Sequence, residues 1–142
     1  GINGFGRMGR LGLRAGWGRK GMAITRVNEI ATDAPGSAHL LQFDSVHGTW
    51  GVDCSAEAQA MIIGGRRITC SRNTAIGETD WSNCDIVIEA TGRHHKQPET
   101  LQRYFDQGDP YFASITFLCD TVTPSAARTR CRGRPRSRTS PD

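Results

Sequence analysis

The pattern of apolar and polar positions at the start of the chain predicts a strand, a helix and a second strand. A short strand at residues 1–3 is followed, after several glycines, by regularly spaced apolar residues without proline, which favour a helix over residues 7–17. Residues 23–27 then alternate between apolar and polar β-formers and predict the second strand. This order is typical of one β-α-β unit, in which the two strands run parallel.

The middle of the chain predicts a second helix and then an antiparallel region. Residues 37–43 suit a short helix with Leu40 and Leu41 facing inward. Residues 51–72 hold three β-forming segments, and the Gly-Gly pair between the last two is typical of a tight hairpin turn. We therefore expect an antiparallel hairpin inserted into an otherwise parallel sheet.

Two further elements complete the predicted domain. The apolar run at residues 85–90 has the pattern of a strand buried on both faces of a parallel sheet. A helix is expected to begin at Pro98, which suits the first helical turn, with Leu101, Tyr104 and Phe105 as its apolar face. The fold class predicted is α/β, the N-terminal part of a Rossmann-type doubly wound parallel sheet.

The character of the chain changes after residue 108. Residues 109–122 hold enough β-formers for one strand of undefined register. From residue 123 to 142, Pro, Ser, Thr and alternating Arg replace core-forming residues, which predicts a disordered basic tail because too little apolar surface is available to offset ordering. We therefore expect one folded domain at residues 1–108.

Composition narrows the class of protein. The 142 residues are enough for one ordinary domain. No apolar run approaches the ~18 residues of a membrane span, and no secretory leader is visible, so we expect a cytoplasmic protein without a membrane partner. The five cysteines have irregular spacings without a C-x-x-C pair, which favours isolated reduced thiols and predicts no metal site.

The formal net charge of +4 belongs to the tail rather than to the predicted domain. Six arginines alternate with other residues over 128–138, and outside residues 126–142 twelve basic and thirteen acidic side chains remain. A basic tail of this kind is one alternative function, non-specific nucleic-acid binding. Because the arginines follow no register typical of a folded module, we expect no nucleic-acid partner.

The strongest candidate chemistry lies at the first predicted strand-to-helix junction. Gly4, Gly6 and Gly9 form a G-x-G-x-x-G pattern, which allows a tight turn, close backbone approach to a pyrophosphate and close packing of helix on strand. Glu29 follows the second strand, 20 positions after Gly9. A carboxylate there accepts both ribose hydroxyls and repels a 2′-phosphate, which predicts NAD in preference to NADP.

Longer segments give a more specific resemblance. The chain is similar, over residues 1–108, to the glyceraldehyde-3-phosphate dehydrogenase family and its erythrose-4-phosphate dehydrogenase relatives. The resemblance rests on five segments: GINGFGRMGR at 1–10, VNE at 27–29, LLQFDSVHG at 40–48, SRN at 71–73 and EATG at 89–92. The run at 13–18 and the SRN segment look closest to the variant associated with bacterial arsenate detoxification.

The resemblance implies a set of cofactor-binding residues and a chemistry. The implied reaction is oxidation of a phosphorylated aldehyde with NAD through a cysteine thioester, in a cytoplasmic homotetramer. Glu29 takes a position where most of the family has aspartate. The residues implied to bind NAD are Asn3, Phe5, Gly6, Arg7, Met8, Glu29, Arg72, Thr91 and Gly92.

The sequence also departs from the family. It contains no Ser-Cys-Thr-Thr-Asn-Cys segment, so neither the family's catalytic cysteine nor its catalytic domain is expected. We expect that a reading-frame shift near Gly108 or a mispredicted gene end accounts for the unfamiliar end. No cysteine has a histidine at a spacing that predicts activation. We expect NAD binding at most, in a sheet left with an open edge beside its first strand. A non-catalytic NAD-binding module is the second alternative.

Overall fold

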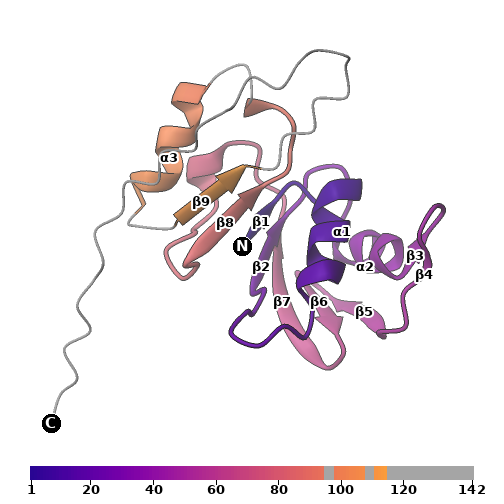
Figure 1. Cartoon of the computed structure of the whole chain (residues 1–142). Helices are drawn as coiled ribbons and strands as arrows, with labels where there is room; N and C mark the ends of the chain where they lie inside the picture. The colour runs from indigo at the N-terminus through magenta and orange to yellow at the C-terminus, as the bar shows by residue number, and fades with distance from the viewer. Residues whose placement is uncertain (95–97, 108–110, 115–142) are drawn as a thin grey trace, which may run out of the picture.

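A computed structural model describes residues 1–94, 98–107 and 111–114, the last segment by its backbone alone. Seven strands form one sheet in the order β5-β6-β7-β2-β1-β8-β9, and a separate two-stranded sheet pairs β3 with β4. Figure 1 shows α1 and α2 on one side of the large sheet and α3 on the other. The predicted α/β doubly wound architecture is confirmed, whereas the predicted tail at 123–142 lies outside the described residues.

The strands and helices have the following bounds. The strands are β1 (Ile2–Asn3), β2 (Arg26–Asn28), β3 (Phe43–Asp44), β4 (Gly48–Thr49), β5 (Cys54–Glu57), β6 (Ala60–Ile63), β7 (Arg66–Ser71), β8 (Ile86–Glu89) and β9 (Tyr111–Ser114). The helices are α1 (Arg7–Gly16), α2 (Ala34–Gln42) and α3 (Gln102–Phe105), with 3-10 turns η1 (Ile76–Glu78) and η3 (Pro98–Leu101).

The parallel part of the sheet is built around β1. Ile2 lies opposite Val27 of β2 on one side and opposite Ile88 of β8 on the other. The expectation of an open edge beside the first strand is therefore wrong, because β8 occupies that edge. β9 pairs in parallel with β8 in turn, and it falls within the 109–122 segment for which one strand was expected.

The antiparallel region is continuous with the parallel sheet rather than a separate layer. β5, β6 and β7 form the expected meander, with Gly64 and Gly65 at positive φ in the turn between β6 and β7. β7 then pairs in parallel with β2, with Val27 opposite Cys70. This pairing places the carboxyl end of β7 next to the carboxyl ends of β2 and β1.

Two hydrophobic cores lie on opposite faces of the sheet. One is formed by residues of β1, β2, α1, α2 and the meander, among them Ile2, Leu13 and Leu41. The other lies beneath α3 and contains Trp81, Val87 and Tyr104. The presence of a core on each face explains why β8 is an apolar run without strict alternation, since Val87 packs in one core and Ile88 against the other.

Two sequence-based expectations about helix faces need correction. Leu41 is fully buried, but Leu40 is 37% exposed because α2 begins at Ala34 and ends at Gln42, which turns Leu40 outward. In α3, Tyr104 is fully buried whereas Phe105 is 47% exposed.

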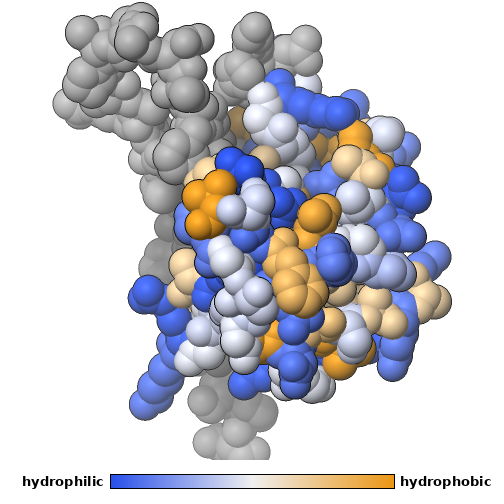
Figure 2. Space-filling view, turned by 90° about the vertical axis from the view of Figure 1, so that its right-hand side faces the viewer, coloured by the Kyte–Doolittle hydropathy of each residue, from blue (hydrophilic) through white to orange (hydrophobic). Residues whose placement is uncertain are grey.

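Figure 2 shows the α1–α2 face as mostly hydrophilic or neutral with separate hydrophobic areas, and exposed Phe43 and Val46 belong to the β3–β4 hairpin beside it.

Candidate functional site

The glycine pattern forms a close-packed turn between β1 and α1. Gly4 has φ +89°, and a Cβ atom on it would lie 2.5 Å from the backbone nitrogen of Thr91. A Cβ atom on Gly9 would lie 2.2 Å from the carbonyl oxygen of Gly4, so the helix and the turn approach as closely as the sequence pattern predicts. The Gly4 amide also donates to the carbonyl oxygen of Asn28 at 2.9 Å, which ties the turn to β2.

The N-terminus of α1 presents its backbone without a protein cap. Gly6 is the N-cap residue, no side chain in the described part of the chain caps the first-turn amides, and the first turn carries no acidic residue. A Cβ atom on Gly6 would meet no atom within 4 Å, so the backbone there faces open space. Uncapped amides at the positive end of a helix dipole favour an anion, and a diphosphate is the anion that this arrangement takes in dinucleotide-binding folds.

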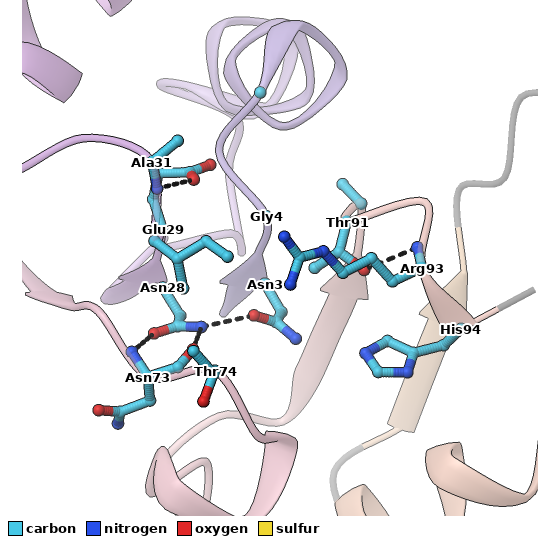
Figure 3. Close-up of a pocket in the computed structure, with 13 residues that line it drawn as sticks. Asn3, Gly4, Asn28, Glu29, Ala31, Asn73, Thr74, Thr91, Arg93 and His94 are labelled. Atoms are coloured by element: carbon cyan, nitrogen blue, oxygen red, sulfur yellow. Dashed lines mark hydrogen bonds between the residues drawn. The ribbon is translucent and has the colours of Figure 1, made fainter. Parts of the chain in front are cut away.

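Glu29 follows β2 and faces the glycine turn. Its Oε2 accepts from the Phe5 amide at 2.6 Å, and its Oε1 accepts from the Ala31 amide at 2.8 Å. The Glu29 amide itself donates to the carbonyl oxygen of Ser71 at 2.9 Å. The carboxylate therefore links the turn after β1 with the segment after β2, and Figure 3 shows it beside the cavity between them.

A cavity of about 180 Å³ opens between these segments at the carboxyl ends of the parallel strands. Ligands of doubly wound folds bind at the carboxyl ends of the parallel strands. The residues that line the cavity are Asn3, Gly4, Gly6, Asn28, Glu29, Ile30, Ala31, Asn73, Thr74, Ala90, Thr91, Arg93 and His94. Four of the nine residues predicted to bind NAD are thus brought together around it: Asn3, Gly6, Glu29 and Thr91.

The other five predicted residues lie around the cavity without lining it. Arg7 and Met8 form the first turn of α1, and Phe5 is 2% exposed beneath the glycine turn. Gly92 follows Thr91 at φ +69°. Arg72 donates to the carbonyl oxygen of Ile30 at 3.0 Å and lines a second, neighbouring cavity together with Asp33, Ser71 and Asn73.

Sequence reasoning missed two cationic or titratable side chains of the cavity. Figure 3 shows Arg93 extending from the loop after β8 toward Gly4. His94 is half-buried, lines the cavity and has Nδ1 2.8 Å from Oγ1 of Thr100. Their position directly after the EATG segment was the available signal, because that segment ends a predicted strand at the same edge.

The described cysteines lack the features of a nucleophile. Burial raises the pKa of the thiols of Cys54 and Cys70, and none of Cys54, Cys70 and Cys84 lines the cavity. A raised pKa lowers the thiolate fraction at neutral pH, and the thiolate is the reactive form. The described part of the chain also contains no cluster of three His, Cys, Asp or Glu side chains that would hold a metal ion.

We expect Cys54 and Cys70 to react with iodoacetamide more slowly than the cysteine of a short unstructured peptide at pH 7.5. The physical reason is the raised thiol pKa, so the reaction should accelerate only as the pH rises above the ordinary thiol range. Mass spectrometry of the peptides that contain these two residues measures each rate separately. Alkylation of either residue faster than the reference peptide contradicts the assignment.

No helix in the described residues has the length and apolar character needed to cross a bilayer. The candidate binding features lie together at the carboxyl ends of the parallel strands. There the glycine turn, the uncapped N-terminus of α1 and the Glu29 carboxylate surround the cavity of about 180 Å³.

Comparison with known proteins agrees with this geometry. Residues 1–97 match the family model described as glyceraldehyde 3-phosphate dehydrogenase, NAD binding domain. Glyceraldehyde-3-phosphate dehydrogenase 3 of Nostoc sp. is 42% identical over 110 residues, which cover 76% of this chain and 32% of that protein. Glyceraldehyde-3-phosphate dehydrogenase 1 of Bacillus subtilis is 37% identical over 104 residues, which cover 72% of this chain and 31% of that protein.

The chain therefore spans about a third of the length of the curated relatives that it matches. The matched part contains the glycine turn, Glu29 and the EATG segment, which are the features that build the cavity. This chain belongs to the glyceraldehyde-3-phosphate dehydrogenase family, and residues 1–97 correspond to the NAD-binding domain of that family.

Proposed function

We propose that this chain binds NAD with the diphosphate on the first-turn amides of α1 and the adenine ribose on Glu29. The observation that carries the proposal is the uncapped N-terminus of α1 beside a cavity whose opposite wall holds a carboxylate. Helix amides supply the donors that a diphosphate needs, and a carboxylate supplies the acceptor that two ribose hydroxyls need. The same carboxylate would repel the 2′-phosphate of NADP.

The remaining predicted residues fit supporting positions in this proposal. Arg7 and Met8 contribute first-turn amides, Thr91 lines the cavity after β8 with Gly92 next to it, and Arg72 donates to the carbonyl oxygen of Ile30. Asn3 lines the cavity and accepts a hydrogen bond from Asn28, and the Phe5 amide donates to Glu29, which ties the glycine turn to the segment after β2. The cavity of about 180 Å³ is smaller than the roughly 300–1,000 Å³ of typical small-molecule sites, so it would enclose part of the dinucleotide.

We further propose that the described residues hold the cofactor and do not carry out the chemical step. Bound NAD supplies a hydride acceptor, and the whole protein of this family is expected to oxidise a phosphorylated aldehyde through a cysteine thioester, as a homotetramer. No described cysteine lines the cavity. The proposed activity of this chain is therefore saturable NAD binding without turnover of glyceraldehyde 3-phosphate or erythrose 4-phosphate.

Isothermal titration calorimetry of the purified chain with NAD, NADP and adenosine tests the binding proposal. We expect saturable heat with NAD at one site, weaker binding of NADP and weaker binding of adenosine, which lacks the diphosphate. Incubation with NAD and either aldehyde phosphate should produce no NADH absorbance. An absence of heat with NAD overturns the proposed function, and NADH formation overturns the division between binding and chemistry.

We expect Arg93→Ala to weaken NAD binding by about 3- to 10-fold, because Arg93 lines the cavity and a cation near a diphosphate contributes about 1 kcal/mol when partly exposed. The effect should shrink at high salt, since exposed charges are screened. Arg103→Ala is the matched control, because Arg103 is exposed on α3, does not line the cavity and removes the same charge. Equal affinities for the two variants across the salt series contradict a role for Arg93.

A further inference from the structure

A chain of buried polar side chains runs beneath the cavity and links the ends of four neighbouring strands. Ser71 of β7 donates through its hydroxyl to Oδ1 of Asn28 at 2.8 Å. Nδ2 of Asn28 donates to Oδ1 of Asn3 at 2.8 Å, and Nδ2 of Asn3 donates to Oε2 of Glu89 at 2.9 Å. Asn28, Asn3 and Glu89 are 5%, 4% and 3% exposed, so this network lies inside the protein.

Glu89 is the last residue of this hydrogen-bonded network, and most of the hydrogen bonds of the network converge on its carboxylate. Its Oε1 accepts from the amide of Thr91 at 2.8 Å and also from the Thr91 hydroxyl. Its Oε2 accepts from Asn3 and from the hydroxyl of Tyr104. A buried carboxylate is tolerated only when its oxygens are hydrogen-bonded, and four donors converge on this one.

The two carboxylate oxygens face different parts of the molecule. Oε1 holds Thr91, the first residue of the loop that continues through Arg93 along the cavity. Oε2 holds Tyr104 of α3, a fully buried residue that does not line the cavity. Nδ2 of Asn3 also donates to the Tyr104 hydroxyl at 2.6 Å, which fixes that hydroxyl against the end of β1.

We propose that Glu89 and Tyr104 are positioning residues for the cofactor, with Tyr104 orienting the Glu89 carboxylate and Glu89 fixing the Thr91–Arg93 loop against the dinucleotide. This inference rests on the proposed function. Removal of the Tyr104 hydroxyl leaves Oε2 with Asn3 as its one donor within the described network. The carboxylate can then rotate, and the two hydrogen bonds that hold Thr91 weaken together.

α3 takes part in this network through Tyr104, although none of its residues lines the cavity. α3 is one turn long and packs through Tyr104 against Trp81, with ring centroids 6.0 Å apart. Because the Tyr104 hydroxyl also donates to Glu89, the position of this hydroxyl and the order of the Thr91–Arg93 loop are coupled through one carboxylate.

The test is Tyr104→Phe in the whole chain, with NAD affinity measured by calorimetry. We expect the Kd to rise about 3- to 10-fold, an effect of the size of one ordinary hydrogen bond, because Tyr104 acts on the cofactor only through Glu89. Trp81→Phe is the matched control: Trp81 is fully buried beside Tyr104, and its Nε1 has no hydrogen-bond partner among the described residues. This control perturbs packing beneath α3 without touching Glu89, so its Kd should stay within about twofold of the parent chain.

Two further measurements separate positioning from a general loss of structure. Hydrogen exchange should show faster amide exchange at Thr91 and Arg93 in Tyr104→Phe than in Trp81→Phe, at equal distance below each variant's Tm. In a double-mutant cycle, Tyr104→Phe and Thr91→Val should raise the Kd by less together than the product of their separate effects, because both act through one carboxylate.

The outcomes distinguish this inference from the proposed function. If the parent chain gives no saturable heat with NAD, the proposed function fails, and the inference fails with it. If the parent chain binds NAD but Tyr104→Phe and Trp81→Phe have equal Kd values, the inference alone is wrong. Independent effects of Tyr104→Phe and Thr91→Val in the cycle likewise contradict transmission through Glu89.

Discussion

Replacement of Glu29 by alanine is expected to raise the Kd for NAD about 10- to 100-fold. The proposed ribose contact is a hydrogen bond to a charged acceptor, worth about 1.5–3 kcal/mol. The same substitution removes the acceptor for the amides of Phe5 and Ala31, so the glycine turn also loses its link to the segment after β2. Calorimetry with NAD and NADP on the same preparation measures both affinity and selectivity.

The NADP measurement makes this prediction specific. Without the carboxylate, repulsion of a 2′-phosphate disappears, so the ratio of NAD affinity to NADP affinity should fall toward one. Glu57→Ala provides the charge-matched control, because Glu57 lies on β5 at the far end of the sheet and pairs only with exposed Arg67 among the described residues. An unchanged NAD affinity in Glu29→Ala would contradict the proposed ribose contact.

The second large effect is expected for alanine at Gly9 or Gly4. At Gly9 the added Cβ atom would lie 2.2 Å from the carbonyl oxygen of Gly4, and this clash involves backbone rather than a movable side chain. At Gly4 the residue would also be held at φ +89°. We expect each substitution to lower the free energy of unfolding by about 2–4 kcal/mol, a large fraction of the stability of a small domain, and to abolish NAD binding.

Gly12→Ala is the control within the same helix. A Cβ atom on Gly12 would meet no atom within 4 Å, and this position lies in the middle of α1. We expect it to raise the free energy of unfolding by about 1 kcal/mol, because alanine is the better helix former. Urea unfolding followed by circular dichroism compares the three variants. A Gly9→Ala chain as stable as the parent contradicts the close approach of α1 to the turn.

Local pattern was sufficient for the elements whose residues mainly contact their sequence neighbours. The expected helix over residues 7–17 is α1 at Arg7–Gly16, and the expected Gly-Gly turn lies between β6 and β7. Burial of individual helix residues was harder to predict. Leu40 and Phe105 are apolar and exposed, because the faces of α2 and α3 depend on where each helix begins and which sheet surface it meets.

For the candidate site, spacing along the chain could predict the residues tied to short-range geometry, whereas Thr91, which is recruited across the sheet, was expected only from the family resemblance. The G-x-G-x-x-G spacing and Glu29 act within one β-α-β unit, so their positions follow from local geometry. Arg93 and His94 line the cavity only because β8 pairs with β1, a contact between segments about 86 positions apart. The spacing of apolar residues within a strand gives no information about which distant strand will pair with it.

The amino-acid sequence by itself determined the fold class and the glycine turn, because both depend on spacing along the chain, and the family, because it rests on segments of similar sequence. Tertiary structure alone decided that β8 closes the edge beside β1, that β7 joins the antiparallel meander to β2, and that the buried carboxylate of Glu89 meets Tyr104. The physical reason is that hydrogen-bond partners of buried polar groups are chosen by packing in three dimensions. Their donors and acceptors come from strands and helices that are distant in sequence.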